Sequence, residues 1–160
     1  CHMELYHGSN SIIKIPNPRL NTSNGKKDFS WGFYCTELYE QAKEWAQTRA
    51  KLTSSPVGVV NVYNYIPKFS LNILQFNTES YEWLNFMLKC REGYSHNYDI
   101  VEGPVGDDKF WHYLQALKAG KITKEKVLKL AKFRNKKTHQ ICFCSEKAVE
   151  CLKFSRSEEV

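Results

Sequence analysis

The sequence predicts an α+β fold in a single domain. Short segments rich in Val, Tyr and Phe are typical of strands, and they occur both early and late in the chain. Segments with apolar residues three and four positions apart are typical of amphipathic helices, and they lie among the strands. The 160 residues are 42% hydrophobic and 14% aromatic, which suits one substantial core. This mixed order, without repeats, indicates α+β.

The first half of the chain is expected to contain four strands and two helices. The strands cover residues 4–6, 33–35, 58–65 and 70–76. Thr36 is the expected N-cap of the first helix, whose buried stripe is Leu38, Ala42, Trp45 and Ala46. The second helix begins at Asn77 or Thr78 and buries Trp83, Leu84, Met87 and Leu88. Prolines, asparagines and a glycine make residues 10–27 a loop, and ordered loops of this length tend to be functional.

The second half is expected to contain two strands and three helices. The strands cover Tyr98–Val101 and Gln140–Cys144. The helices run from Asp107 and Asp108 to Gly120, from the cap Thr123 to Phe133, and from the cap Ser145 to Leu152. Residues 155–160 are expected to be a polar tail, so the domain covers residues 4–154. Residues 1–3 are interpreted as a cloning remnant followed by the initiator Met3.

Composition narrows the class of protein. The net charge of +6 favours polyanionic partners, including dinucleotides and nucleic acid. No apolar run is long enough to span a membrane and no signal-peptide pattern is present, so we expect a cytoplasmic protein with no membrane contact. The five cysteines after Cys1 are odd in number, scattered and without a Cys-x-x-Cys motif. They predict reduced thiols, with neither a disulfide framework nor a metal site.

Two stretches, Leu5–Ser9 and Asp28–Thr36, carry the strongest functional signal. Each contains a glycine among larger side chains, and glycine allows a flat ligand or another backbone to come close. Taken alone, the second stretch is more typical of a core strand with a glycine bulge. A histidine at a strand end, such as His7, is likewise more often structural than a ligand-binding residue.

Together these stretches resemble the opening motifs of the ADP-ribosyltransferase fold in its His-Tyr-Glu branch, the diphtheria-toxin and poly-ADP-ribose-polymerase type. More closely, the chain resembles the small bacterial family DUF3990. Its pattern of Tyr-His-Gly-Ser, Asp-Phe-Gly-x-Gly-Phe-Tyr-x-Thr, Tyr-Asp-x-Val-x-Gly-Pro-x-x-x-Asp and a late Gln-Ile-x-Phe is met almost throughout. The resemblance covers residues 4–154 and implies a split, mixed β-sheet flanked by helices.

The resemblance also implies roles for the motif residues, with NAD as co-substrate. It places His7 on the adenosine ribose, the backbone of Gly8 on the nicotinamide carboxamide, and Ser9 beside the ribose. It stacks Tyr34 on nicotinamide, with Phe33 as its neighbour in the cofactor-binding set. A core tyrosine is the alternative interpretation of Tyr34.

The third position of the His-Tyr-Glu set departs from the pattern, because Gln140 stands where the branch has glutamate. An amide oxygen accepts the ribose hydrogen bond but brings no charge, and a charge-assisted bond is about twice as strong. The DUF3990 pattern itself has Gln here. Asp108 is our candidate for an acid that positions or deprotonates the acceptor, with helix capping as the alternative. Asp28 is a further candidate for the missing carboxylate.

The sequence therefore predicts an enzyme, a mono-ADP-ribosyltransferase that transfers ADP-ribose from NAD⁺ to a macromolecular acceptor, nucleic acid or protein. By resemblance it is a toxin paired with an antitoxin protein, or a defence effector. The basic segment 118–137 either guides a nucleic-acid acceptor, through Lys129, Lys132, Arg134, Lys136 and Lys137, or is a solvated face. The alternative function is a non-catalytic module that binds NAD, ADP-ribose or nucleic acid on the same fold.

Overall fold

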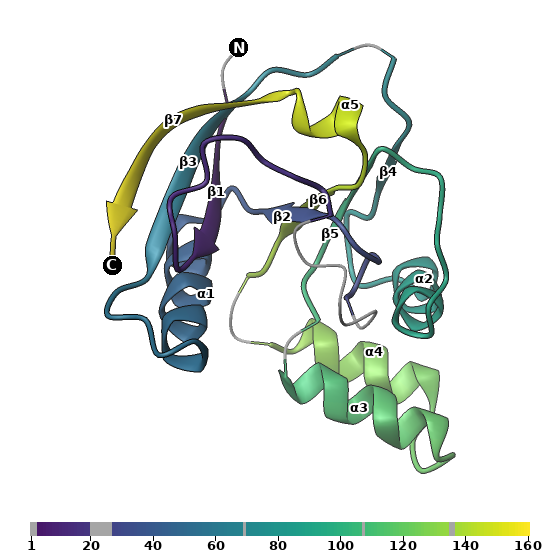
Figure 1. Cartoon of the computed structure of the whole chain (residues 1–160). Helices are drawn as coiled ribbons and strands as arrows, with labels where there is room; N and C mark the ends of the chain where they lie inside the picture. Colours follow the sequence, from purple (N-terminus) through teal and green to yellow (C-terminus); the bar gives the residue numbers. More distant parts are fainter. Residues whose placement is uncertain (1–2, 20–26, 69, 107, 135–136) are drawn as a thin grey trace.

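The computed structural model describes residues 3–19, 27–68, 70–106, 108–134 and 137–160, apart from the side chain of Asp108. Two β-sheets and five helices form this part of the chain (Figure 1). The α+β fold predicted from the sequence is confirmed.

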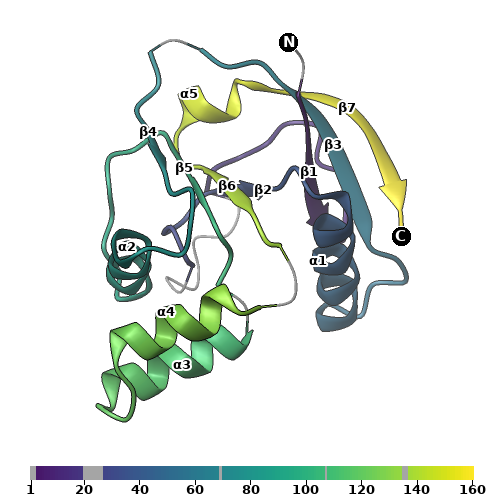
Figure 2. The same ribbon diagram turned by 180° about the vertical axis from the view of Figure 1, so that it is seen from behind.

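The first sheet has three antiparallel strands in the order β1-β3-β7. They are β1 (Met3–Ser9), β3 (Val59–Tyr65) and β7 (Leu152–Glu159). Helix α1 (Tyr39–Leu52) covers one face of β1 and β3 (Figure 2). The approach is close because Gly8 carries no side chain: a Cβ atom there would lie 2.3 Å from the carbonyl oxygen of Ala42.

The second sheet has four strands in the order β2-β6-β5-β4, all antiparallel except the pair β4 and β5. The strands are β2 (Phe33–Cys35), β4 (Ile73–Gln75), β5 (Ile100–Gly103) and β6 (Gln140–Phe143). The remaining helices are α2 (Tyr81–Arg91), α3 (Asp108–Lys118), α4 (Lys124–Lys132) and α5 (Glu146–Val149). The first three lie towards one end of the sheet and α5 towards the other (Figure 1).

The two sheets meet where β1 passes the end of β2. The N–H of Tyr6 donates to the carbonyl of Thr36 at 2.8 Å, and the N–H of Thr36 donates to the carbonyl of Tyr6 at 2.9 Å. Leu5, Phe33 and Phe143 belong to one buried cluster that joins the sheets behind this bridge.

Two expected helix caps are wrong. Leu38, not Thr36, precedes α1, and it makes no side-chain capping bond. The Thr36 hydroxyl instead accepts from the N–H of Leu38 at 3.0 Å, because a turn separates β2 from the helix. Helix α2 is capped by Ser80, whose hydroxyl accepts from the N–H of Trp83 at 3.2 Å. The expected caps Thr123 and Ser145 are confirmed.

The expected polar tail at 155–160 is also wrong, because β7 continues to Glu159. Its polar composition reflects an edge strand with a solvent-facing side. Arg156 donates to Glu4 across the sheet at 2.9 Å and to Glu158 on its own strand at 3.0 Å. Leu152 begins this strand instead of ending α5. At the other end, Met3 belongs to β1, and residues 1–2 lie outside the described residues.

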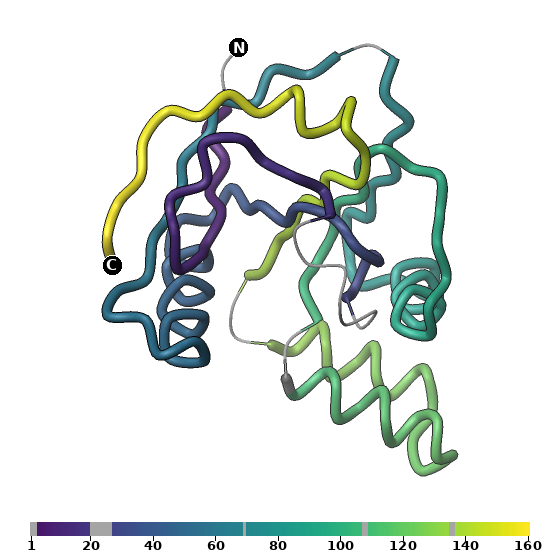
Figure 3. The backbone as a smooth tube through the Cα atoms, viewed as in Figure 1, coloured from purple at the N-terminus to yellow at the C-terminus, as the bar shows by residue number. Residues whose placement is uncertain are grey.

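The first part of the expected loop, residues 10–19, crosses in front of the first sheet (Figure 3). Asn61 of β3 is fully buried and holds this segment through both ends of its amide. Its Oδ1 accepts from the N–H of Ile13 and its Nδ2 donates to the carbonyl of Ser11, each at 3.0 Å. Residues 20–26 of the expected loop lie outside the described residues.

Candidate functional site

A cavity of about 510 Å³ opens between the two sheets. Its size is typical of small-molecule sites. It is lined by His7, Gly8, Ser9, Asp28, Tyr34 and Gln140, among others. The structure thus brings together all the predicted site residues whose side chains it describes, except Phe33. Phe33 lies behind the cavity wall, with its ring stacked on His7 at 4.0 Å between centroids.

His7 is oriented by a backbone group. Its Nδ1 lies 2.6 Å from the carbonyl oxygen of Tyr34, which only accepts, so Nδ1 carries the proton. Burial lowers the pKa of His7 to about 4, so the ring is neutral at pH 7. In this tautomer Nε2 is an acceptor, suited to a hydroxyl donor such as that of a sugar.

Gly8 presents its backbone to the same side as the bridge between the sheets. Successive residues of a strand direct their N–H and C=O groups to opposite sides, so Gly8 directs its groups as Tyr6 does. The N–H and C=O groups of Tyr6 bond to Thr36, on the side of β1 that faces away from β3. The strand β2 begins at Phe33, and Gly8 lines the cavity. The backbone N–H donor and C=O acceptor of Gly8 match the C=O and N–H groups of a planar amide.

Tyr34 forms a rigid wall of the cavity. Its hydroxyl accepts from the N–H of Phe29 at 3.0 Å and donates to the carbonyl of Ser30 at 2.5 Å. Ser30 has φ of 72°, a left-handed conformation, at the position where the DUF3990 pattern has glycine. Burial raises the pKa of Tyr34 well above its ordinary value, so the ring is neutral. The fixed ring provides an aromatic platform.

Gln140 begins β6 and is buried at the base of the cavity. Its Nε2 donates to Asp28 Oδ2 at 2.9 Å and to the carbonyl of Pro104 at 3.3 Å. Asp28 also accepts from the N–H of Gly106 at 2.8 Å and from Arg91 Nη2. A buried carboxylate therefore lies directly beside the amide.

The sequence did not single out Arg91 or Gly106. Arg91 ends α2, 63 positions from Asp28, and no local pattern connects the two. Gly106 carried a usable signal, since it is the second glycine within four residues, after Gly103. A Cβ atom at Gly106 would lie 2.6 Å from Met87 Cε and 3.3 Å from Asp28 Oδ1, so glycine permits the close approach.

Two further acids near Gly103, Asp99 and Glu102, do not line the cavity. Asp99 serves structure, because it accepts from the N–H of Asn72 at 2.8 Å and from the Ser145 hydroxyl at 2.7 Å. Glu102 lies 3.9 Å from His139 Nε2, and burial raises its pKa. Asp108 begins α3, and its side chain lies outside the described residues.

The basic segment is divided between structural and exposed cations. Arg134 donates to the carbonyl of Val105 at 2.5 Å and lies 3.8 Å from Glu79. Lys129, Lys132 and Lys137 are exposed, whereas Lys136 lies outside the described residues. Lys132, Arg134 and Lys137 line a second hollow of about 370 Å³.

The five described cysteines are free thiols, all buried. Cys142 and Cys144 lie on one face, with their sulfur atoms 3.3 Å apart. No group of three His, Cys, Asp or Glu side chains within the described ranges is arranged to hold a metal ion. None of the helices in that part of the chain has both the length and the apolar character needed to cross a membrane.

Fold and site together define an α+β domain with a ligand-sized cavity between two sheets, lined by a buried histidine, a tyrosine ring and an amide paired with a carboxylate. The family model described as "Protein of unknown function (DUF3990)" matches residues 3–154. The chain belongs to the DUF3990 family, as the sequence motifs indicated. No curated protein and no solved structure matches it.

Proposed function

We propose that the protein is a mono-ADP-ribosyltransferase that binds NAD⁺ in the cavity between its sheets. The observation that carries the proposal is the convergence of three motif elements from separate parts of the chain. His7 with Gly8 on β1, Tyr34 on β2 and Gln140 on β6 line the same cavity.

Each element offers a group that suits one part of NAD⁺. The Tyr34 ring stacks on the planar nicotinamide cation by dispersion and ring electrostatics. The edge N–H and C=O of Gly8 pair with the carboxamide, and neutral His7 accepts from a ribose hydroxyl. Gln140 accepts from the other ribose through Oε1, since its Nε2 is already bonded.

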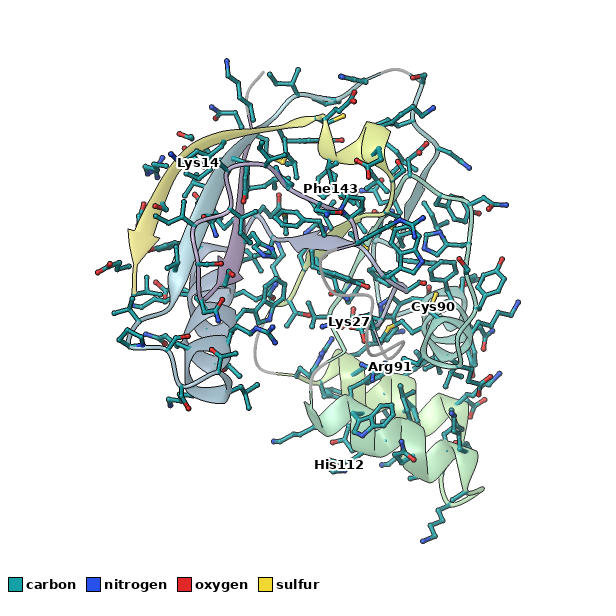
Figure 4. All side chains as sticks on the ribbon, in the orientation of Figure 1. Lys14, Lys27, Cys90, Arg91, His112 and Phe143 are labelled. Carbon is teal, nitrogen blue, oxygen red and sulfur yellow. The ribbon has the colours of Figure 1, made fainter. Side chains whose placement is uncertain are left out.

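The same cavity is lined by cationic side chains, which suit the diphosphate of NAD⁺. Lys27, Arg49 and Arg91 contribute to its wall, and Figure 4 labels two of them, Lys27 and Arg91, in the space between α1 and α2. Arginine and lysine bind phosphate oxygens through charge-assisted hydrogen bonds.

The reaction breaks the bond between the ribose C1′ and the nicotinamide nitrogen. The bonding electron pair leaves with nicotinamide, which departs neutral, and the ribose acquires oxocarbenium character. A nucleophile of the macromolecular acceptor, a nucleic acid or a protein, then bonds to C1′ and loses its proton. Cytoplasmic action as a toxin controlled by an antitoxin, or as a defence effector, is the biological setting we propose.

Removing the platform tests this function. In Tyr34→Ala, the stacking contact worth about 1–3 kcal/mol is lost, so we expect nicotinamide release from labelled NAD⁺ to fall about fivefold to about 150-fold. Tyr34→Phe keeps the ring and should stay within a few-fold of the parent. Tyr94→Ala removes an exposed tyrosine away from the cavity and serves as the matched control.

Transfer of label to RNA, DNA or protein fractions identifies the acceptor class. Equal release from Tyr34→Ala and the parent would overturn the assignment. NAD⁺ binding without release would instead support the alternative, a non-catalytic module, which the uncharged Gln140 side chain favours.

A further inference from the structure

The buried carboxylate of Asp28 lies at the centre of the site. It is 7% exposed and accepts hydrogen bonds from three parts of the chain: Gln140 of β6, the backbone of Gly106 and Arg91 of α2. Its two oxygens thus meet an amide N–H, a backbone N–H and a guanidinium, the kinds of donor that pair with a buried carboxylate.

We propose that Asp28 is the positioning residue that orients Gln140 and supplies the negative charge of the site, and that it makes an amide necessary at position 140. This inference rests on the proposed ADP-ribosyl transfer. It assigns to a pair of side chains the work that the His-Tyr-Glu set gives to one glutamate.

The orientation follows from hydrogen-bond chemistry. Both Asp28 Oδ2 and the Pro104 carbonyl are acceptors, so the atom of Gln140 between them is the amide nitrogen and not the oxygen. The flip that places Oε1 against these acceptors is therefore disfavoured. Oε1 remains as the acceptor for a ribose hydroxyl in the cavity.

The same geometry explains why glutamate is disfavoured at position 140. A glutamate oxygen in place of Nε2 would lie about 2.9 Å from Asp28 Oδ2. Two carboxylates at this separation cannot both be ionised, and one of them takes up a proton with a strongly raised pKa. The amide accordingly keeps one negative charge in the site, and Asp28 carries it.

That charge favours the step in which nicotinamide departs. As the bond to C1′ breaks, positive charge develops on the ribose, and Asp28 stabilises it through the polarised amide of Gln140. Arg91 partly offsets the charge and holds the carboxylate in place. Asp28 thus acts through Gln140 and is not itself the group that touches the sugar.

Three variants test the pair: Asp28→Asn, Gln140→Glu, and the two substitutions combined. In Asp28→Asn we expect kcat for nicotinamide release to fall about tenfold or more, with KM changed little, because the charge acts in the transition state. Gln140→Glu should lower the free energy of unfolding at pH 7 and recover part of it at pH 5, where the pair shares a proton. The double variant again holds one carboxylate and one amide, so part of its stability should recover at pH 7, although the Pro104 carbonyl then faces a carboxylate.

Matched controls change charge elsewhere. Glu150→Gln removes an exposed acid, and Gln115→Glu adds one on the exposed face of α3. The other charged or titratable groups around the pair are common to all variants; among the described residues they include His7, Lys27, Tyr34, Arg49, Cys90, Arg91, Glu102 and His139. Differences between variants therefore report on positions 28 and 140.

The outcomes separate this inference from the proposed function. A parent that releases no nicotinamide refutes the transferase, while the stability cycle at pH 7 and pH 5 still tests the pair. A parent that turns over equally with Asp28→Asn overturns the role of Asp28. Additive effects on stability, with no recovery in the double variant, overturn the pairing itself.

Discussion

His7 shows how one buried side chain makes the stability of the fold depend on pH. Its ring lies between the Tyr34 carbonyl and the Phe33 ring, and it gives up most of its contact with water. The folded state therefore favours the neutral form of His7.

Acidification should destabilise the protein through His7. The folded pKa of about 4 lies below the ordinary value of 6.5, so the unfolded chain takes up the proton first. The stabilising effect of the neutral form is complete above about pH 6.5 and is lost as the pH falls towards 4, by up to about 3 kcal/mol. Urea unfolding between these pH values measures the loss.

The matched comparison for this prediction is between His7→Asn and His112→Asn. The first keeps a donor for the Tyr34 carbonyl but cannot titrate, so its stability should fall less steeply with acid than that of the parent. The second changes an exposed histidine of α3 and should retain the parental slope. Identical slopes for the parent and His7→Asn would contradict the prediction.

At the level of residues, the motif resemblance singled out His7, Tyr34 and Gln140 because each stands in a short run of recognisable neighbours, and the structure places all three at one cavity. The partnership of Asp28 with Gln140 and Arg91 could not be predicted in the same way. It depends on how β6 and α2 are placed against the Asp28 segment, over separations of 112 and 63 positions.

At the level of elements, the position of α1 depends on glycines in and next to the first sheet. A Cβ atom at Gly8 would lie 2.3 Å from the Ala42 carbonyl and 2.7 Å from the Ala46 nitrogen. At Gly58 it would lie 2.6 Å from the Ala46 carbonyl carbon. The helix backbone thus rests directly on the strands, next to the cavity.

Gly8→Ala should force α1 away from β1. Overpacking of this kind costs about 1–3 kcal/mol, and we expect a loss at the upper end because rigid backbone atoms are the neighbours. Gly93→Ala is the comparison: its Cβ atom meets nothing within 4 Å, and its φ of 101° leaves only backbone strain. Thermal or urea unfolding of the two variants distinguishes them, and equal losses would contradict the packing argument.

The types of elements were largely predictable, whereas several boundaries were not. Apolar periodicity located α2 and α4, since their buried faces are regular. The strand β7 was missed because an edge strand exposes polar side chains, and its sequence then looks like a tail. Pairing with β3, a long-range contact, is what defines it.

For the whole molecule, β7 protects the edge of β3 that would otherwise be open. Residues 155–160 pair with the first half of β3, and Val160 exchanges two backbone hydrogen bonds with Gly58, at 2.9 and 3.3 Å. The last strand in the sequence thus completes the sheet that begins with the first.

Deletion of residues 155–160 should destabilise the domain by about 2 kcal/mol or more, given about 0.5–1.5 kcal/mol for each lost hydrogen bond. It should also promote self-association through the uncovered edge. Urea unfolding and size-exclusion chromatography measure the two effects. Arg156→Ala removes only exposed ion pairs, which solvent screens, and should leave the stability close to that of the parent. A truncated chain as stable and monomeric as the parent would refute this view of β7.

The cavity lies where the two sheets meet, so a bound ligand affects the stability of the whole fold. A ligand that contacts His7 on one sheet and Gln140 on the other links the two sheets. It adds to the backbone bridge between Tyr6 and Thr36, which also joins them. Mass action then makes ligand concentration a determinant of the lifetime of the fold, with about 2.7 kcal/mol gained at a hundred times the dissociation constant. Where such a ligand is depleted in a cell, the ligand-free protein unfolds more often and is more exposed to proteolysis. The abundance of the protein then follows the supply of its ligand.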